Sequence, residues 1–219
     1  MKVGLPKEYF VEGLDKEVEK RVAAAVAKLK EAGAKIVEVS LPHTKYALAI
    51  YYIIMAAEVS SNLARFDGIR FGLSVAKDKR VKTLEEVYTK SRSLGFGQEV
   101  KRRLILGSFV LSSGYYDAYY KQAALARRLL THDFELAWQK ADCLITPTTP
   151  TTAFKIGEKV TDPLTMYLSD IYTVSANLAG LPALSMPVGR VEGLPVGLQI
   201  MGPTGADELI LEVAEKIEK

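Results

Sequence analysis

Few residues of this 219-residue chain have the types and spacing that would support catalysis on their own. The two histidines, His43 and His132, are isolated in the sequence, and no His, Cys or carboxylate cluster has metal-ligand spacing. There is also no G-x-S-x-G elbow, no H-E-x-x-H pair and no glycine-rich loop that would cradle a phosphate. We therefore expect structural roles for both histidines and no cofactor or metal site in this chain.

Two charged side chains stand out because they fall in stretches predicted to form apolar helices. Asp170 is the one charged residue in the helix-like run from Leu164 to Leu178. A carboxylate on a mostly buried helix needs a partner, so Asp170 is either paired within the protein or meets a ligand. Arg103 ends a run of three basic residues in a predicted helix, Gln98 to Leu111. Adjacent residues on a helix point in different directions, so at most one or two of the three face inward.

The composition is that of an ordinary globular protein, with 48% hydrophobic and 25% charged residues. The net charge of +3 comes from interspersed charges and does not favour direct binding of nucleic acid. Cys143 is the single cysteine, so no internal disulfide forms, and its apolar neighbours predict a buried thiol. The longest apolar run, Tyr46 to Ala57, is shorter than the roughly 20 residues of a membrane helix. We expect a soluble, cytoplasmic protein that does not bind membranes.

The N-terminal region alternates between strand-like and helix-like patterns. A short strand is expected from Val3 to Leu5, followed by a helix that begins at Asp15 and ends at Gly33. A strand rich in β-branched residues follows, from Ala34 to Leu41. Strand, helix and strand with tight connections predict a parallel β-α-β unit. We therefore predict an α/β fold with a mixed β-sheet flanked by helices.

The stretch from Asp162 to Pro203 organises the rest of the chain, because its glycines and prolines fall at joints. After the apolar helix-like run, a Gly-Leu-Pro break precedes a predicted strand from Ala183 to Val188. A turn containing Gly189 and Gly193 then leads into a second strand, Val196 to Met201. The pattern predicts two consecutive strands with a helix before them.

Two long helices are expected in the middle of the chain. The first runs from Tyr46 to Phe66. The second carries the pairs Tyr115/Tyr119 and Tyr116/Tyr120, whose i,i+4 spacing predicts two stacked pairs along the helix. An aromatic stripe of this kind is typical of a buried core.

Several strings resemble the amidase signature family. NLAGLPALSMPVG followed by LPVGLQIMGP is similar to the C-terminal half of these enzymes, and PTTPTTAF resembles them as well. EVSSNLARFDGIRFG and SGYYDAYY are similar to one group within the family, the A subunits of glutamyl-tRNA(Gln)/aspartyl-tRNA(Asn) amidotransferases. The resemblance covers nearly all of the chain but half of the family's protein. Residues 1–219 are therefore expected to be the C-terminal portion of an amidase signature domain.

The resemblance implies a reaction that this chain does not complete by itself. The family uses a serine activated through a second serine by a lysine, on a glycine- and serine-rich segment that these residues do not contain. The expected role of the chain is to supply walls of a glutamine pocket. In the whole subunit, the serine would release ammonia to a partner subunit that uses ATP and Mg to amidate misacylated tRNA in protein biosynthesis. The expected partners are glutamine and the other two subunits, with tRNA reached only indirectly.

Free glutamine carries a carboxylate and an ammonium on one carbon, so a selective pocket needs a fixed cation and a fixed anion. The resemblance implies that Arg103 binds the carboxylate, that Asp170 binds the ammonium, and that Tyr51 or its neighbour Tyr52 adds a wall contact. The alternative is that Arg103 and Asp170 pair with each other or with other neighbours. One departure from the family is Ser175, where a proline is usual.

Two other functions stay open. The chain is alternatively part of a general amidase that acts on another amide, although the two subunit-specific strings argue against this. Or it is a non-catalytic α/β module that binds a small ligand or scaffolds a partner. The DNA upstream of Met1 distinguishes these readings, because an in-frame lysine and paired, glycine-flanked serines would support the enzyme. A sheet deprived of half its strands should expose apolar surface and self-associate.

Overall fold

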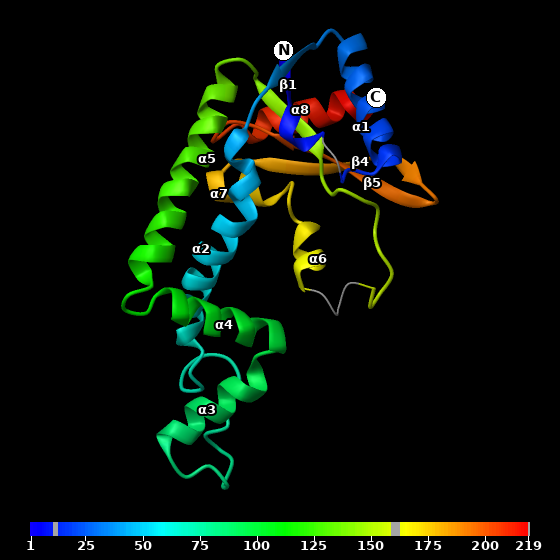
Figure 1. Ribbon diagram of the computed structural model, residues 1–219. Coiled ribbons are helices and arrows are strands. Elements are labelled where there is room, and N and C mark those ends of the chain that lie inside the picture. The colour runs from blue at the N-terminus through cyan, green and yellow to red at the C-terminus, as the bar shows by residue number, and fades with distance from the viewer. Residues whose placement is uncertain (11–12, 159–162, 219) are drawn as a thin grey trace. The chain divides into compact units, whose positions relative to one another are not determined.

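The computed structural model describes residues 1–10, 13–158 and 163–218 (Figure 1). The chain divides into two compact units. The first, here called the sheet unit, consists of Met1–Leu48 and Ala126–Lys219. The second, here called the helical unit, is Ala49–Leu125.

The sheet unit is built on a mixed β-sheet, as predicted. Within the described residues the sheet has five strands in the order β2-β1-β3-β5-β4. The β1 strand pairs in parallel with β2 and β3, whereas β5 pairs antiparallel with β3 and β4. The strands are β1 (Lys2–Pro6), β2 (Lys35–Val39), β3 (Cys143–Pro147), β4 (Ala183–Val191) and β5 (Leu194–Met201). The mixed sheet and its flanking helices confirm the predicted α/β class.

The predicted parallel β-α-β unit is present as β1, α1 (Lys16–Glu31) and β2. The Asp15 carboxylate caps α1 by accepting hydrogen bonds from the backbone N–H groups of Glu17 at 2.8 Å and Val18 at 3.1 Å. The chain leaves the helix through Gly33, whose φ of +88° suits glycine. Cap, helix and glycine stop therefore fold as the sequence pattern indicates.

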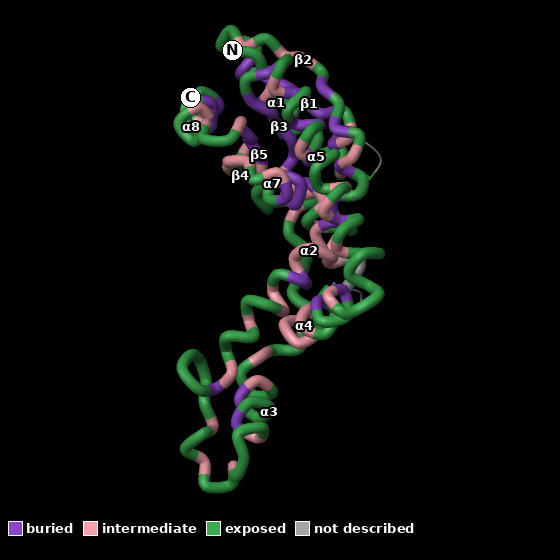
Figure 2. Tube along the Cα trace, turned by 90° about the vertical axis from the view of Figure 1, so that its left-hand side faces the viewer, coloured by how far each residue is buried: buried purple, intermediate pink, exposed green. Residues whose placement is uncertain are grey.

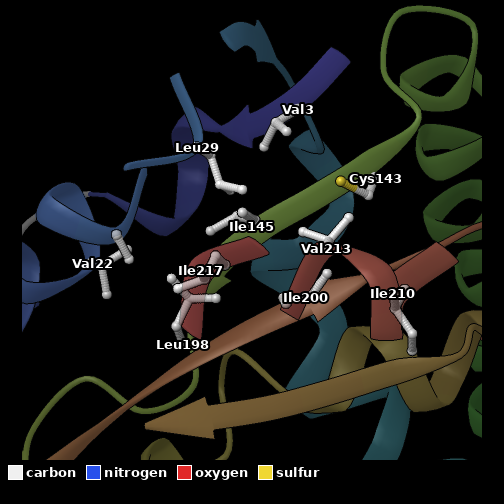
Figure 3. Packing of buried hydrophobic residues seen from close by; sticks show 11 residues of the cluster. Val3, Val22, Leu29, Cys143, Ile145, Leu198, Ile200, Ile210, Val213 and Ile217 are labelled. Carbon is white, nitrogen blue, oxygen red and sulfur yellow. The ribbon is translucent and has the colours of Figure 1, made fainter. Parts of the chain in front are cut away.

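The main core lies where α1 and α8 (Asp207–Glu218) pack against the strands (Figure 3). The side chains labelled there come from α1, α8, β1, β3 and β5: Val3, Val22, Leu29, Cys143, Ile145, Leu198, Ile200, Ile210, Val213 and Ile217. Each fully buried aliphatic side chain of this kind contributes about 1.5–3 kcal/mol to stability. Burial raises the pKa of the Cys143 thiol to about 11, so the predicted inert, buried cysteine is confirmed.

The β4–β5 hairpin has a tighter turn than the sequence predicts. Glu192 and Gly193 both have positive φ angles, +49° and +82°, as a two-residue type I′ turn requires. Gly193 is therefore a turn residue, as expected. Gly189 is not, because it lies inside β4 at a register shift between Pro187 and Arg190.

The predicted continuous helix from Leu164 to Leu178 is wrong. The structure has two short helices, α6 (Pro163–Leu168) and α7 (Val174–Ala179), separated by a turn that contains Asp170. In this turn the Thr173 hydroxyl donates to the backbone carbonyl of Asp170 at 3.1 Å. Polar side chains that bond to nearby backbone compete with helix formation. Asp170 is consequently exposed and does not lie on a buried helix face.

The helical unit contains most of α2 together with α3, α4 and η4, and α5 continues from it into the sheet unit. Within the β-α-β unit, a short helical turn, η1 (Lys7–Tyr9), connects β1 to α1. The helices and helical turns between β2 and β3 are η2 (Pro42–Tyr46), α2 (Ala47–Asn62), η3 (Leu63–Arg65), α3 (Leu84–Gly95), α4 (Gln98–Val110), η4 (Tyr116–Lys121) and α5 (Gln122–Trp138). Buried residues are concentrated in the sheet unit, and most of the helical unit is exposed or half-buried (Figure 2).

The tyrosine stripe is stacked as predicted, but it is not core. The ring centroids of Tyr115 and Tyr119 are 6.0 Å apart, and those of Tyr116 and Tyr120 are 5.2 Å apart. Three of these side chains, Tyr115, Tyr116 and Tyr119, are exposed. The i,i+4 spacing specifies that the rings meet, but it does not specify that another element covers them.

The helix predicted from Tyr46 to Phe66 begins earlier in the structure and ends close to the predicted residue. The segments η2, α2 and η3 follow one another without a break, and Pro42–Arg65 reaches 24 residues. By length and composition alone this stretch is sufficient to cross a membrane. The core helix of a soluble protein passes the same test, so a single such helix is weak support for a membrane span.

Ser175, which stands where the family usually has a proline, has a buried partner. Its hydroxyl forms a hydrogen bond with the Tyr9 hydroxyl, and both residues are buried. The Tyr9 ring also stacks on Tyr172, with a centroid distance of 5.2 Å. Burial raises the pKa of Tyr9, so its phenol stays protonated and needs a hydrogen-bond partner.

We expect Ser175→Ala to reduce the free energy of unfolding by about 1–3 kcal/mol, because the buried Tyr9 hydroxyl loses its partner. The double variant Tyr9→Phe with Ser175→Ala should lose less, since both polar groups are then removed together. Urea unfolding followed by circular dichroism measures both changes. Equal losses in the single and double variants would show that this hydrogen bond does not stabilise the sheet unit.

Candidate functional site

Arg103 projects from α4 toward α2 within the helical unit. Its Nε donates to Glu99 Oε1 at 2.8 Å, one helical turn earlier on α4. Its Nη1 lies 3.2 Å from the Met55 sulfur and 3.5 Å from the Tyr51 hydroxyl oxygen, the latter at the outer limit of a hydrogen bond. The side chain of Arg103 is 26% exposed. Two of the predicted site residues, Arg103 and Tyr51, are therefore neighbours.

Tyr51 and Tyr52, one of which was predicted to line the pocket, both lie beside the Arg103 guanidinium. The carbon at its centre, Arg103 Cζ, is 5.8 Å from the centre of the Tyr52 ring, within reach of a cation–π contact. The rings of Tyr51 and Tyr52 meet edge to face at 5.1 Å. Tyr51 thus approaches Arg103 with its hydroxyl, and Tyr52 approaches with its ring.

The surroundings keep Arg103 positively charged. Partial burial lowers the pKa of its guanidinium, but hydrogen bonds with Glu99 and Tyr51 outweigh this and raise the pKa overall. Glu99 also pairs with Arg102 through its second carboxylate oxygen. Two arginines share one carboxylate, so the local balance is positive and suits a negatively charged ligand group.

A glycine brings α2 and α4 close enough for these contacts. Gly107 lies one turn after Arg103 on α4, and a Cβ placed there would be 1.9 Å from the backbone oxygen of Ala56 on α2. Any larger residue would push the two helix backbones apart. A lone glycine inside a predicted helix was the sequence signal for this close approach.

Asp170 lies in the sheet unit, apart in sequence and in unit from Arg103 and Tyr51. Its carboxylate forms no hydrogen bond or ion pair with any residue that the structure describes, and the side chain is exposed. Of the two alternatives for Asp170, a partner within the protein or a ligand, the first is not found among the described residues, because the turn between α6 and α7 presents the side chain to solvent. The carboxylate is therefore available to a cationic group.

Neither histidine is isolated in space. His43 is held by Asp133, a buried residue of α5, whose carboxylate accepts from the His43 backbone N–H at 2.8 Å and contacts Nδ1 at 2.9 Å. His132 Nδ1 lies 2.9 Å from Glu135 on the same helix. The first pair joins η2 to α5, which is a structural role.

The sheet unit contains a set of hydrogen-bonded amide and hydroxyl side chains that the sequence did not reveal. Gln199 Nε2 donates to Thr146 Oγ1 at 2.9 Å and to the Tyr172 carbonyl at 3.0 Å. The hydroxyls of Thr148 and Ser185 are 2.7 Å apart. The Gln199 amide therefore links β5 to β3 and to the turn before α7, and the two hydroxyls link the loop after β3 to β4. In the described ranges, no three His, Cys, Asp or Glu side chains are grouped to hold a metal.

Comparison with known proteins places the chain in a family. Residues 1–211 match the family model described as Amidase. The chain belongs to the amidase family. This confirms the family resemblance of the C-terminal strings, and the α/β sheet with its helices agrees with solved amidase structures. One solved amidase has a TM-score of 0.73 at 23% identity, which supports the shared fold alone.

Within the amidase family, several of the proteins similar to this chain share one name. The A subunit of the glutamyl-tRNA(Gln) amidotransferase from Thermodesulfovibrio yellowstonii is 56% identical over all of this chain and 45% of its own length. The protein of the same name from Koribacter versatilis is 55% identical, with the same coverage. The crystal structure of its namesake from Thermotoga maritima matches with a TM-score of 0.75 and 40% identity, over 100% of this chain and 42% of its own. The chain thus spans less than half the length of these relatives.

We expect Gly107→Ala to destabilise the helical unit by about 3 kcal/mol, because the new methyl group meets the Ala56 carbonyl of a packed helix. Gly95→Ala is the matched control: a Cβ there has its nearest contact at 3.6 Å, and the change should be neutral or slightly stabilising. Urea midpoints measured by circular dichroism test both variants. Similar midpoints would contradict the close packing of α2 and α4.

Proposed function

We propose that this chain is part of the glutaminase subunit of a tRNA-dependent amidotransferase. The observation that supports this most strongly is the match of the whole chain, at 56% identity, to a protein named as the A subunit of a glutamyl-tRNA(Gln) amidotransferase. Membership of the amidase family supports the same reaction class, cleavage of an amide bond. The chain supplies walls of the glutamine pocket, and the Ser-Ser-Lys group that attacks the amide lies outside these residues.

In this proposal, opposite charges recognise the two ends of the amino acid. Arg103 binds the α-carboxylate, for which a planar guanidinium with parallel N–H donors is well suited. Tyr51, whose hydroxyl lies beside Arg103 Nη1, lines the same part of the pocket. Asp170 binds the α-ammonium, and its exposed carboxylate lacks a competing partner among the described residues. An amide without both charged groups would gain neither contact, which gives selectivity.

The remaining steps belong to the partners. The ammonia released from glutamine passes to a second subunit, which uses ATP and Mg to amidate misacylated tRNA, and a third subunit completes the complex. This chain contributes no cofactor and meets tRNA only indirectly, in keeping with its small net charge of +3. The complex works in the cytoplasm.

We expect the purified chain to release no ammonia from glutamine, because it lacks an activated nucleophile. Fusing it to the T. yellowstonii protein, in place of the matching 45% of that protein, should give an active chimera. Ammonia release measured with a coupled glutamate dehydrogenase assay tests both forms. Activity of the chain alone would refute the proposed division of roles, and an inactive but folded chimera would argue against the proposed function.

In the active chimera, Arg103→Ala and Asp170→Ala should each raise the KM for glutamine at least tenfold, because each removes one charged contact to the substrate. A tenfold change corresponds to about 1.4 kcal/mol. Arg80→Ala and Asp117→Ala are matched controls, since both side chains are more than half exposed and lie in local ion pairs away from Arg103 and Asp170. An unchanged KM for either variant would remove that residue from the pocket.

A further inference from the structure

Arg103 has two edges with which it can bind a carboxylate. A guanidinium offers five N–H donors in a rigid plane, and two parallel donors fit the two oxygens of a carboxylate. One edge consists of Nε and one Nη nitrogen, and the other consists of Nη1 and Nη2. Which edge meets a ligand depends on what the protein itself occupies.

Glu99 occupies the Nε edge. Its Oε1 accepts from Arg103 Nε at 2.8 Å, across one turn of α4. Its second oxygen accepts from Arg102 Nη1. Glu99 is the second residue of α4, after the N-cap Gly97, where a carboxylate is favoured by the helix dipole. The acceptor is therefore held at both oxygens and anchored to the helix end.

The Nη1/Nη2 edge of Arg103 has weaker hydrogen-bond acceptors than the Nε edge. Among the described residues, the acceptors for Nη1 are the Met55 sulfur, which is weak, and the Tyr51 hydroxyl at 3.5 Å. No acceptor for Nη2 is found in the described part of the helical unit. A ligand carboxylate at this edge would gain two charge-assisted hydrogen bonds and lie next to the Tyr51 hydroxyl, which can donate a third.

We propose that Glu99 is the positioning residue of the substrate site: it holds the Nε edge of Arg103, so that the α-carboxylate of glutamine binds end-on at the Nη1/Nη2 edge beside Tyr51. This inference rests on the proposed function, in which Arg103 binds that carboxylate. Glu99 does not touch the substrate. It removes the rotation of a long side chain before the ligand arrives, so that less conformational freedom is lost on binding.

The neighbouring charge makes this arrangement favourable. A carboxylate close to a bound carboxylate would weaken binding through repulsion, but Glu99 lies between Arg102 and Arg103 and both of its oxygens are engaged. The two positive charges of Arg102 and Arg103 exceed the single negative charge of Glu99. Glu99 therefore orients Arg103 without cancelling the positive charge that attracts the substrate.

The test uses the active chimera and separates KM from kcat. Glu99→Ala should raise the KM for glutamine roughly tenfold and leave kcat within about twofold, because only orientation of the carboxylate contact is lost. Glu99→Gln should stay within about threefold of the parent KM, since its amide oxygen still accepts from Nε. Glu85→Ala is the matched control, because Glu85 is likewise the second residue of its helix, α3, after N-cap Thr83.

Each failure has a distinct meaning. If Arg103→Ala raises KM but Glu99→Ala does not, Glu99 has no positioning role and the proposed function stands. If Glu99→Gln is as impaired as Glu99→Ala, the hydrogen bond to Nε is not the cause, and the inference is also overturned. If Arg103→Ala leaves KM unchanged, the proposed function of Arg103 and the role of Glu99 fall together.

A measurement on the chain itself checks the structural link without activity. The Arg103 Nε–H signal in a proton–nitrogen NMR spectrum should exchange with solvent faster in Glu99→Ala than in Glu99→Gln, because only the latter keeps an acceptor. Circular dichroism establishes that both variants are folded. Equal exchange rates in both variants and the parent chain would show that Glu99 does not hold the Nε edge.

Discussion

The ion pair between Arg103 and Glu99 determines what the helical unit can offer to a ligand. Arg103, whose side chain is 26% exposed, needs acceptors, and Glu99 meets that need at one edge of the guanidinium while the other edge faces a sulfur and a phenol. Gly107 makes this possible, because it allows α2 to approach α4 to a distance that no side chain would permit. The Arg103–Glu99 ion pair and the close packing at Gly107 therefore both occur where α4 meets α2.

In the sheet unit, hydrogen bonds of buried polar side chains hold the turn that carries Asp170. Gln199 of β5 donates to the Thr146 hydroxyl of β3 and to the Tyr172 carbonyl in the turn before α7. The turn that carries Asp170 leads into α7, whose Ser175 forms a hydrogen bond with the buried Tyr9. An exposed carboxylate can thus belong to a turn that is held by backbone hydrogen bonds. Its position is set by backbone hydrogen bonds and buried hydroxyls, while the carboxylate itself stays uncommitted.

Local patterns were sufficient to predict the strands, the parallel β-α-β unit and the buried Cys143, because each depends on periodicity, caps and glycine stops within a short stretch. They failed for the helix around Asp170, where apolar composition concealed a turn stabilised by Thr173. The Glu99–Arg103 pair has i,i+4 spacing and was readable in the sequence. Its contact with Tyr51 was not, because that depends on how closely two distant helices pack.

The burial of Cys143 has a practical consequence for work on this protein. A thiol whose pKa is near 11 is almost entirely protonated at neutral pH, and its sulfur is closed off from reagents in solution. A cysteine introduced at an exposed position would then be the one reactive thiol of the native chain. Spectroscopic probes could be attached at chosen sites on either unit while the natural sulfur stays in place.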